Sequence, residues 1–188
     1  MSDKYDFSRY DNYKVSMKID PNEKPFMHSC PADVSLRFYE KGDERLWAYC
    51  QWKCKAFESF DEALKYFEEN FATKEADISE RMIFAINNTK HIIGTITAWN
   101  YDDRENSDGT VRFWAVLPEY RNRGIGQALL AMCLTVLNEK HKSIIVECVF
   151  RNWLAVSLFL KSGFLPRIFN EDDKSVWSAL LSSIVGDK

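Results

Sequence analysis

The alternation of apolar and polar residues predicts two short strands near the start of the chain, over residues 13–19 and 34–40. Apolar positions then recur every three or four residues over 44–57 and over 59–71, which predicts two helices. The second helix should begin at a capping box, because Ser59 is followed three residues later by a glutamate. The first third of the chain therefore combines strands and helices.

The middle of the chain is predicted to add three strands. Residues 81–87 and 91–99 are largely apolar runs separated by an asparagine pair, a pattern that favours an antiparallel hairpin. A polar loop is expected over 101–109. Residues 110–117 show too little alternation for a strand with one face in water, so we expect both faces to be covered.

Helical and strand-like patterns alternate in the last third. A helix of about four turns is predicted to start near residue 124. A strand over 143–150, a helix over 152–163 and a strand over 164–170 are predicted to follow. The segment 174–185 is compatible with either a strand or a helix.

This order of elements predicts an α/β (α+β) fold in which a mixed central sheet carries helices on its faces. The unit from 110 to 150 should form a right-handed parallel crossover. A length of 188 residues fits one domain, so we expect a single unit over 1–188. Within it, residues 1–33 are expected to be an irregular N-terminal extension, because three prolines interrupt them.

Composition and charge narrow the function classes. A hydrophobic content of 46% argues against a disordered chain. A net charge of −3 without a block of lysine and arginine predicts no nucleic-acid partner. No leader-like segment and no apolar run of about 18 residues occur, which predicts a cytoplasmic protein without membrane contact. The five cysteines lack metal-type spacing, so no metal is expected.

The turn between the strand at 110–117 and the following helix carries the first candidate chemistry. The first N–H groups of a helix lack internal partners and lie at the positive end of its dipole, so they favour an anion. Gly124 and Gly126 allow close approach of the backbone, and Arg121 and Arg123 add charges suited to phosphate. The turn predicts a pyrophosphate site. A purely structural role of the glycines in a tight turn remains the alternative.

Two common nucleotide motifs do not fit this turn. A P-loop requires lysine and then serine or threonine after its last glycine, whereas Gln127 and Ala128 follow here. A dinucleotide-binding fingerprint requires a small residue where this chain has Leu129, and it belongs to the first strand–helix unit of a fold. A different pyrophosphate ligand is therefore indicated.

Two segments together resemble the GNAT N-acetyltransferase superfamily. The first reads V-x-P-E-Y-R-x-R-G-I-G-x-A-L-L from residue 116, and the second reads N-W-L-A-V-S-L-F-L-K-S-G-F over 152–164. One helix and one strand separate them, as in that family. The resemblance implies an acyl-CoA-binding core over 110–165. It also implies a mostly antiparallel sheet whose central parallel strands splay apart, and acetyl-CoA as the co-substrate.

The resemblance also implies a set of binding residues. Backbone N–H groups from Arg123 to Ala128 would hold the pyrophosphate, and the N–H of Trp114 would bind the acetyl carbonyl. Asn152 would contact the pantetheine arm, although it is equally suited to cap the following helix. The complete implied set for the co-substrate is Ala115, Val116, Arg121, Arg123, Gly124, Ile125, Gly126, Gln127, Ala128, Asn152 and Phe159.

Two positions depart from the family pattern. Phe159 stands where many members carry a tyrosine that protonates the departing thiolate, and Thr110 stands where some carry a glutamate base. Glu147, on the predicted strand over 143–150, is the candidate base here, and Ser157 and Tyr120 are weaker candidates for the acid.

The resulting hypothesis is an N-acetyltransferase that moves the acetyl group of acetyl-CoA to an amine of a small molecule or a protein. The amine would attack directly within a ternary complex, without a covalent enzyme intermediate. The alternative is a catalytically inactive domain that binds acyl-CoA as a sensor or scaffold. The sequence does not identify the acceptor, and it leaves the formation of a homodimer open.

Overall fold

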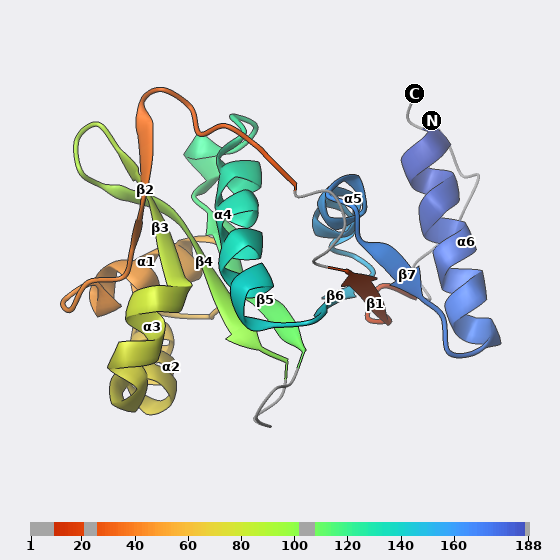
Figure 1. Ribbon diagram of the computed structural model, residues 1–188, viewed down its shortest axis with the longest axis horizontal. Coiled ribbons are helices and arrows are strands. Elements are labelled where there is room, and N and C mark those ends of the chain that lie inside the picture. The colour runs from red at the N-terminus through yellow and green to blue at the C-terminus, as the bar shows by residue number, and fades with distance from the viewer. Residues whose placement is uncertain (1–9, 21–25, 102–107, 187–188) are drawn as a thin grey trace.

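A computed structural model describes residues 10–20, 26–101 and 108–186. Its centre is a seven-stranded sheet with the order β2-β3-β4-β5-β6-β1-β7 (Figure 1). The strands are β1 (Lys14–Ile19), β2 (Val34–Phe38), β3 (Met82–Asn87), β4 (Ile92–Asn100), β5 (Gly109–Val116), β6 (Ile144–Val149) and β7 (Leu165–Arg167). The α-helices are α1 (Glu44–Lys53), α2 (Phe60–Phe71), α3 (Glu75–Arg81), α4 (Ile125–Lys140), α5 (Trp153–Lys161) and α6 (Glu171–Gly186), and short 3-10 turns cover Ala72–Lys74 and Pro118–Tyr120.

The sheet is mixed and mostly antiparallel, which confirms the predicted fold class. The pairs β2–β3, β3–β4, β4–β5, β6–β1 and β1–β7 are all antiparallel. β5 and β6 are parallel, and their pairing is confined to one register position, Gly109 opposite Ile144. The two strands therefore start side by side, and the rest of the edge of β5 that faces β6 has no ladder partner.

Helices cover both faces of the sheet because successive side chains of its strands point to opposite sides. On β3, Met82 and Phe84 belong to the apolar cluster formed with α1, α2 and α3. The alternate residues Ile83 and Ala85 point to the other face and belong to the cluster on the side of α4. Helices α5 and α6 join that second cluster at the other end of the sheet, beside β6, β1 and β7 (Figure 1).

A bulge in β5 sets the direction of the strand beyond it. The register against β4 shifts between Arg112 and Ala115, and Phe113 has a φ of +52°, which a bulky side chain rarely adopts. Buried Gln51 of α1 donates its side-chain N–H to the carbonyl of Phe113 at 2.9 Å. The Phe113 ring packs on Trp47, with 5.1 Å between the ring centroids. These contacts from α1 stabilise an otherwise unfavourable backbone.

Most of the elements expected from the pattern are present. The hairpin of β3 and β4, the strand β5 and the long helix α4 lie close to their predicted ranges. Ser59 caps α2 by accepting the N–H of Glu62 at 3.1 Å. β1 is hydrogen-bonded between β6 and β7, so this part of the N-terminal 33 residues belongs to the sheet.

Three local expectations need correction or completion. Residues 72–80 are helical, although no element was expected there, and Arg81, expected to begin a strand, ends α3. The strand expected over 164–170 is reduced to β7, and the ambiguous segment that follows is the helix α6. Most of the loop expected over 101–109 lies outside the described residues.

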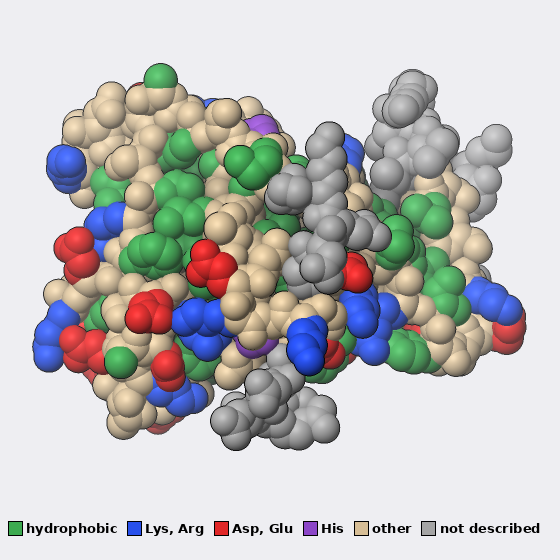
Figure 2. Space-filling model, viewed as in Figure 1, with side chains coloured by type: hydrophobic (Ala, Val, Ile, Leu, Met, Phe, Trp, Pro, Cys, Tyr) green, Lys and Arg blue, Asp and Glu red, His purple; other side chains and the backbone are tan. Residues whose placement is uncertain are grey.

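Charged side chains of both signs lie on the face that Figure 2 shows. In the view of Figure 2, acidic and basic side chains are interspersed over the end of the molecule that carries α2 and α3. Among the described helices, none combines the length and the apolar character needed to cross a membrane.

Trp47 is the large side chain whose removal should cost the most stability. It is fully buried and touches several aromatic rings, whereas Trp153 is 52% exposed. We expect Trp47→Ala to lower the free energy of unfolding by about 3–5 kcal/mol, because it leaves a large cavity. Trp153→Ala should lower it by less than about 1 kcal/mol. Urea-induced unfolding measures both, and similar losses would contradict this description of the core.

Candidate functional site

The start of α4 presents unpaired backbone donors. Gly124 precedes the helix with a φ of +82°, a left-handed conformation that suits glycine. Within the described part of the chain, no acceptor binds the N–H groups of Ile125, Gly126 or Gln127. The N–H of Ala128, one residue further on, donates to the carbonyl of Gly124 at 3.0 Å. Three donors and the helix dipole are therefore directed at one point.

The two glycines of this turn serve different purposes. A Cβ at Gly124 would combine an unfavourable φ with a contact of 2.7 Å to Nε2 of His28. A Cβ at Gly126 would lie 3.5 Å from the ring of Trp114, which is an ordinary van der Waals contact. Gly124 is thus required by the backbone, whereas Gly126 keeps the space in front of the helix open.

The free edge of β5 is the second source of backbone groups without a partner strand. The N–H of Leu117 donates to the carbonyl of Ile93 on β4 at 2.9 Å. Neighbouring residues of a strand direct their backbone groups to opposite edges, so the N–H and carbonyl of Val116 face away from β4. This is the side from which β6 has diverged. Val116 therefore offers one donor and one acceptor to an added extended chain.

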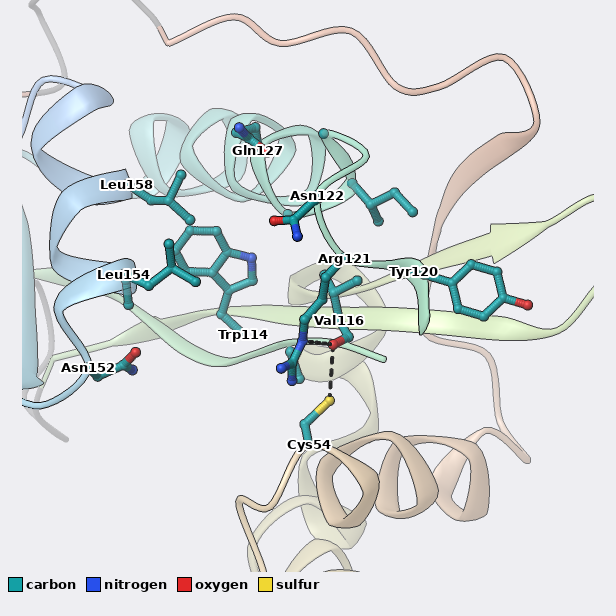
Figure 3. A pocket seen from close by; sticks show the side chains of 15 residues that line it. Cys54, Trp114, Val116, Tyr120, Arg121, Asn122, Gln127, Asn152, Leu154 and Leu158 are labelled. Atoms are coloured by element: carbon teal, nitrogen blue, oxygen red, sulfur yellow. Dashed lines mark hydrogen bonds between the residues drawn. The ribbon is translucent and has the colours of Figure 1, made fainter. Parts of the chain in front are cut away.

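Both features border one cavity of about 520 Å³ (Figure 3). Its walls come from β5, from the turn before α4, from the start of α5 and from the end of α1. The lining residues are Cys54, Trp114, Ala115, Val116, Tyr120, Arg121, Asn122, Gly124, Ile125, Gly126, Gln127, Asn152, Leu154, Ala155 and Leu158. A site with apolar walls and a few convergent polar groups is typical of a small-molecule pocket.

Helix α5 closes the cavity opposite α4. Asn152 occupies its N-cap position, yet its side chain makes no capping hydrogen bond, and it lines the cavity instead. Trp114 points toward α5 and packs on Phe159, with 5.2 Å between the ring centroids (Figure 3). Phe159 itself is 3% exposed and lies between Trp114 and Phe164. Its ring supports the wall from behind.

The structure gathers nine of the thirteen predicted site residues around the cavity. They are Trp114, Ala115, Val116, Arg121, Gly124, Ile125, Gly126, Gln127 and Asn152. Four others do not line it. Ala128 and Phe159 are buried behind the wall. Arg123 forms an ion pair with Asp33 at 2.5 Å, and Glu147 lies on the exposed part of β6.

None of the three polar candidates for acid and base chemistry directs its functional group into the cavity. Glu147 accepts a hydrogen bond from the hydroxyl of Tyr101 at 2.6 Å, and this bond raises the pKa of Tyr101. Tyr120 lines the cavity, but its hydroxyl accepts from the side chain of Asn87 and points away from Trp114 (Figure 3). Ser157 is buried. Among the described residues, no group of three His, Cys, Asp or Glu side chains is suited to a metal.

Arg121 and Cys54 both bind the carbonyl of Val116 that faces away from β4. Nε of Arg121 donates to this oxygen at 3.0 Å, and the thiol of Cys54 donates to it at 3.3 Å (Figure 3). Arg121 therefore lies along β5 rather than over the start of α4. Its guanidinium is the only charged group among the lining residues, so the cavity favours an anion.

Cys54 is chemically distinct from the other cysteines. A hydrogen bond from Cys50 lowers the pKa of Cys54 to about 7, and Arg121 contributes in the same direction against the opposing effect of burial. The pKa of fully buried Cys50 is raised, chiefly by the same hydrogen bond, so Cys50 stays protonated. Burial also raises the pKa of Cys148 to about 12. Of these three cysteines, Cys54 ionises at the lowest pH.

Five further residues line the cavity without having been predicted as site residues: Cys54, Asn122, Leu154, Ala155 and Leu158. Asn122 adopts a φ of +59°, which asparagine tolerates better than most residues, and it lies inside the predicted phosphate turn. Leu154 lies inside the second motif, but the sequence pattern does not indicate that its side chain faces the cavity. Cys54 ends a helix sixty-two residues before Val116, and nothing in the local pattern indicates that the two meet.

The family model described as "Acetyltransferase (GNAT) family" matches residues 44–164, which is more than half of the chain. No curated protein matches.

Solved structures share the fold. A GCN5-related N-acetyltransferase from Sphaerobacter thermophilus is 20% identical, with a TM-score of 0.64 over 82% of this chain and 48% of its own. A tandem GNAT protein from the clavulanic acid biosynthesis pathway is 14% identical, with a TM-score of 0.61 over 81% of this chain and 50% of its own. An acetyltransferase of the GNAT family from Novosphingobium aromaticivorans, described as putative in its name, is 12% identical, with a TM-score of 0.58 over 82% and 59%. The chain spans about half the length of these proteins.

The reactivity of Cys54 provides a direct test of the electrostatics of the site. At pH 7 we expect a small alkylating reagent to modify Cys54 first, and Cys54→Ser should remove the fast phase while Cys148→Ser retains it. Because the pKa of Cys54 is lowered, the rate of the fast phase should rise through about pH 7 instead of near pH 9. Mass spectrometry of the timed reaction identifies the labelled residue. Preferential labelling of Cys148 would refute the assignment.

Proposed function

The chain belongs to the GNAT acetyltransferase family, and from this premise we propose that it transfers the acetyl group of acetyl-CoA to an amine of a small molecule or a protein. The attack would be direct, within a ternary complex. One observation carries the proposal: the free edge of β5 and the unpaired start of α4 border the same cavity. An extended amide chain that ends in a pyrophosphate matches that combination of groups.

The pyrophosphate, the pantetheine amides and the acetyl group each have a complementary part of the cavity. The N–H groups of Ile125, Gly126 and Gln127 suit the pyrophosphate, because helix starts favour anions. The N–H and carbonyl of Val116 suit the pantetheine amides as an added strand would. We assign the N–H of Trp114 to the acetyl carbonyl. There it would stabilise the negative charge that develops on that oxygen during attack.

The transfer also requires a base for the acceptor amine. A protonated amine must lose a proton before or during attack. The titratable side chains that line the cavity are Cys54, Tyr120 and Arg121, so no carboxylate borders it among the described residues. We therefore propose that Glu147, which lies outside the cavity wall, removes the proton from the acceptor amine. A water molecule could relay the proton.

The second candidate function is an acyl-CoA-binding domain without turnover. It is favoured by the burial of Phe159 and Thr110, which stand where family members carry a tyrosine and a glutamate. A panel of amines with acetyl-CoA separates the two functions. Release of free CoA thiol that depends on the amine supports the transferase. Tight binding of acetyl-CoA without amine-dependent release across the panel supports the sensor or scaffold.

Gly126→Val tests the phosphate site. The Cβ of the new side chain meets only ordinary contacts, and the branched side chain is expected to fill the space in front of the α4 donors. We expect the affinity for CoA to fall at least about tenfold, because charge-assisted hydrogen bonds are lost. Isothermal titration calorimetry measures the effect, and thermal unfolding checks the fold. The control is Thr135→Val on the exposed side of α4. Unchanged affinity in Gly126→Val would remove the start of α4 from the site.

Asp33→Asn tests whether Arg123 contributes to the same site. Asp33 now pairs with Arg123, and both side chains are about half-exposed. Removal of the carboxylate frees the guanidinium for a phosphate, so we expect CoA to bind about two- to fivefold more tightly at low salt. Glu171→Gln is the matched control, because it breaks a similar exposed ion pair on α6. Weaker or unchanged binding in Asp33→Asn would show that Arg123 does not contact the phosphates.

A further inference from the structure

Cys54 combines three properties that no role described so far uses. It borders the cavity, it lies at the free edge of β5, and it is flanked by a buried thiol and a guanidinium. Tyr120 and Arg121 are the other titratable lining residues. The hydroxyl of Tyr120 is directed elsewhere and a guanidinium is not a nucleophile. Cys54 is therefore the available nucleophile in the cavity wall.

We infer that Cys54 is a self-acylation site, at which the cavity transfers the acyl group of a bound acyl-CoA thioester to the protein itself. The inference rests on the proposed function, because it requires the thioester to lie along β5. It extends that function, because the acyl group reaches a residue of the chain when no amine is present. The substrate class is an acyl-CoA thioester.

The position of the sulfur supports this assignment. Sγ of Cys54 is 3.3 Å from the carbonyl oxygen of Val116. Trp114, whose N–H is assigned to the acyl carbonyl, precedes Val116 by two residues, which is about 7 Å along a strand. The thiol and the expected thioester thus share one short stretch of the cavity. Arg121 lies on the same carbonyl and must leave it when a pantetheine amide binds, which frees Cys54 to rotate.

The surroundings favour the thiolate of Cys54 over that of its neighbours. Cys50 lies beneath it, is fully buried and donates a hydrogen bond to its sulfur. Arg121 supplies a positive charge. Three effects oppose a negative charge on Cys54: the C-terminal end of the α1 dipole, the carboxylate of Glu119 and burial. The thiol of Cys50 and the guanidinium of Arg121 outweigh them, so the pKa of Cys54 is lowered. As a neutral thiol, Cys54 donates to Val116, and it loses that bond on ionisation.

The chemistry needs no further reactant. The thiolate of Cys54 attacks the carbonyl carbon of the thioester and forms a new carbon–sulfur bond. The bond from that carbon to the CoA sulfur breaks, and its electron pair leaves with CoA, which takes up the proton that Cys54 released. One thioester replaces another, so no oxidant or reductant is involved. The pKa of Cys54 is about 7, below the value of about 8.5 for an ordinary thiol, so the exchange favours the CoA thioester and an excess of acetyl-CoA drives it forward.

The acyl group would then occupy the edge of β5. Attached to Cys54, it would lie beside the Val116 carbonyl, where a pantetheine amide is expected to bind. Acylated protein should therefore bind CoA more weakly than unmodified protein. Hydrolysis of the thioester would restore the original cavity.

The test is incubation of the purified protein with acetyl-CoA in the absence of amine, followed by intact-mass spectrometry and peptide mapping. We expect one acetyl group, located on Cys54 and removed by neutral hydroxylamine, as a thioester should be. Cys54→Ser and Cys54→Ala should each lower incorporation at least about tenfold, because neither side chain forms a thiolate. Cys148→Ser is the control and should incorporate as much as the unmodified protein.

Titration of CoA binding in the same samples separates the failure of this inference from that of the proposed function. If acetyl-CoA binds and Cys54 stays unmodified, the self-acylation site is refuted and the function stands. If acetyl-CoA does not bind, the proposed function is refuted, and the self-acylation site, which rests on it, is refuted with it. Gly126→Val should lose the modification together with binding. Equal labelling of Cys54 in that variant would show reaction from free solution and would also refute the inference.

Discussion

The divergence of β5 from β6 is the constraint on which the rest of the site depends. The two parallel strands share one register position at their start, and beyond it the backbone of β5 has no partner on that side. Unpaired strand edges are costly when buried, so natural sheets cover or satisfy them. Here the Val116 carbonyl is satisfied by Arg121 and Cys54, two side chains that can move away. The sheet therefore contains a vacant strand position.

Contacts from both faces keep that position open. On one face, Gln51 and Trp47 hold the bulge at Phe113, so β5 bends just before the cavity. On the other face, Trp114 packs on Phe159 of α5. The start of α4 follows β5 after a short turn, which brings its unpaired N–H groups to the end of the same opening. A ligand that is extended at one end and anionic at the other fits this arrangement, and the fit does not depend on which amine accepts the acetyl group.

The sequence predicts the framework well because local periodicity determines it. The hairpin of β3 and β4, the cap at Ser59 and the glycine turn before α4 all follow from neighbouring residues. The helical segment 72–80 is missing from the prediction because Ile78 is its one buried residue and gives no period. The bulge at Phe113, the Cys54–Val116 contact and the displacement of Glu147 from the cavity depend on residues far apart in the chain, which no local pattern records.

The most direct test of the central claim is amide hydrogen exchange resolved to single residues, with and without CoA. If the ligand adds to the free edge of β5 and to the start of α4, exchange should slow at Val116 and at Ile125, Gly126 and Gln127. Slower exchange elsewhere on the molecule, with these amides unchanged while CoA is bound, would contradict the account.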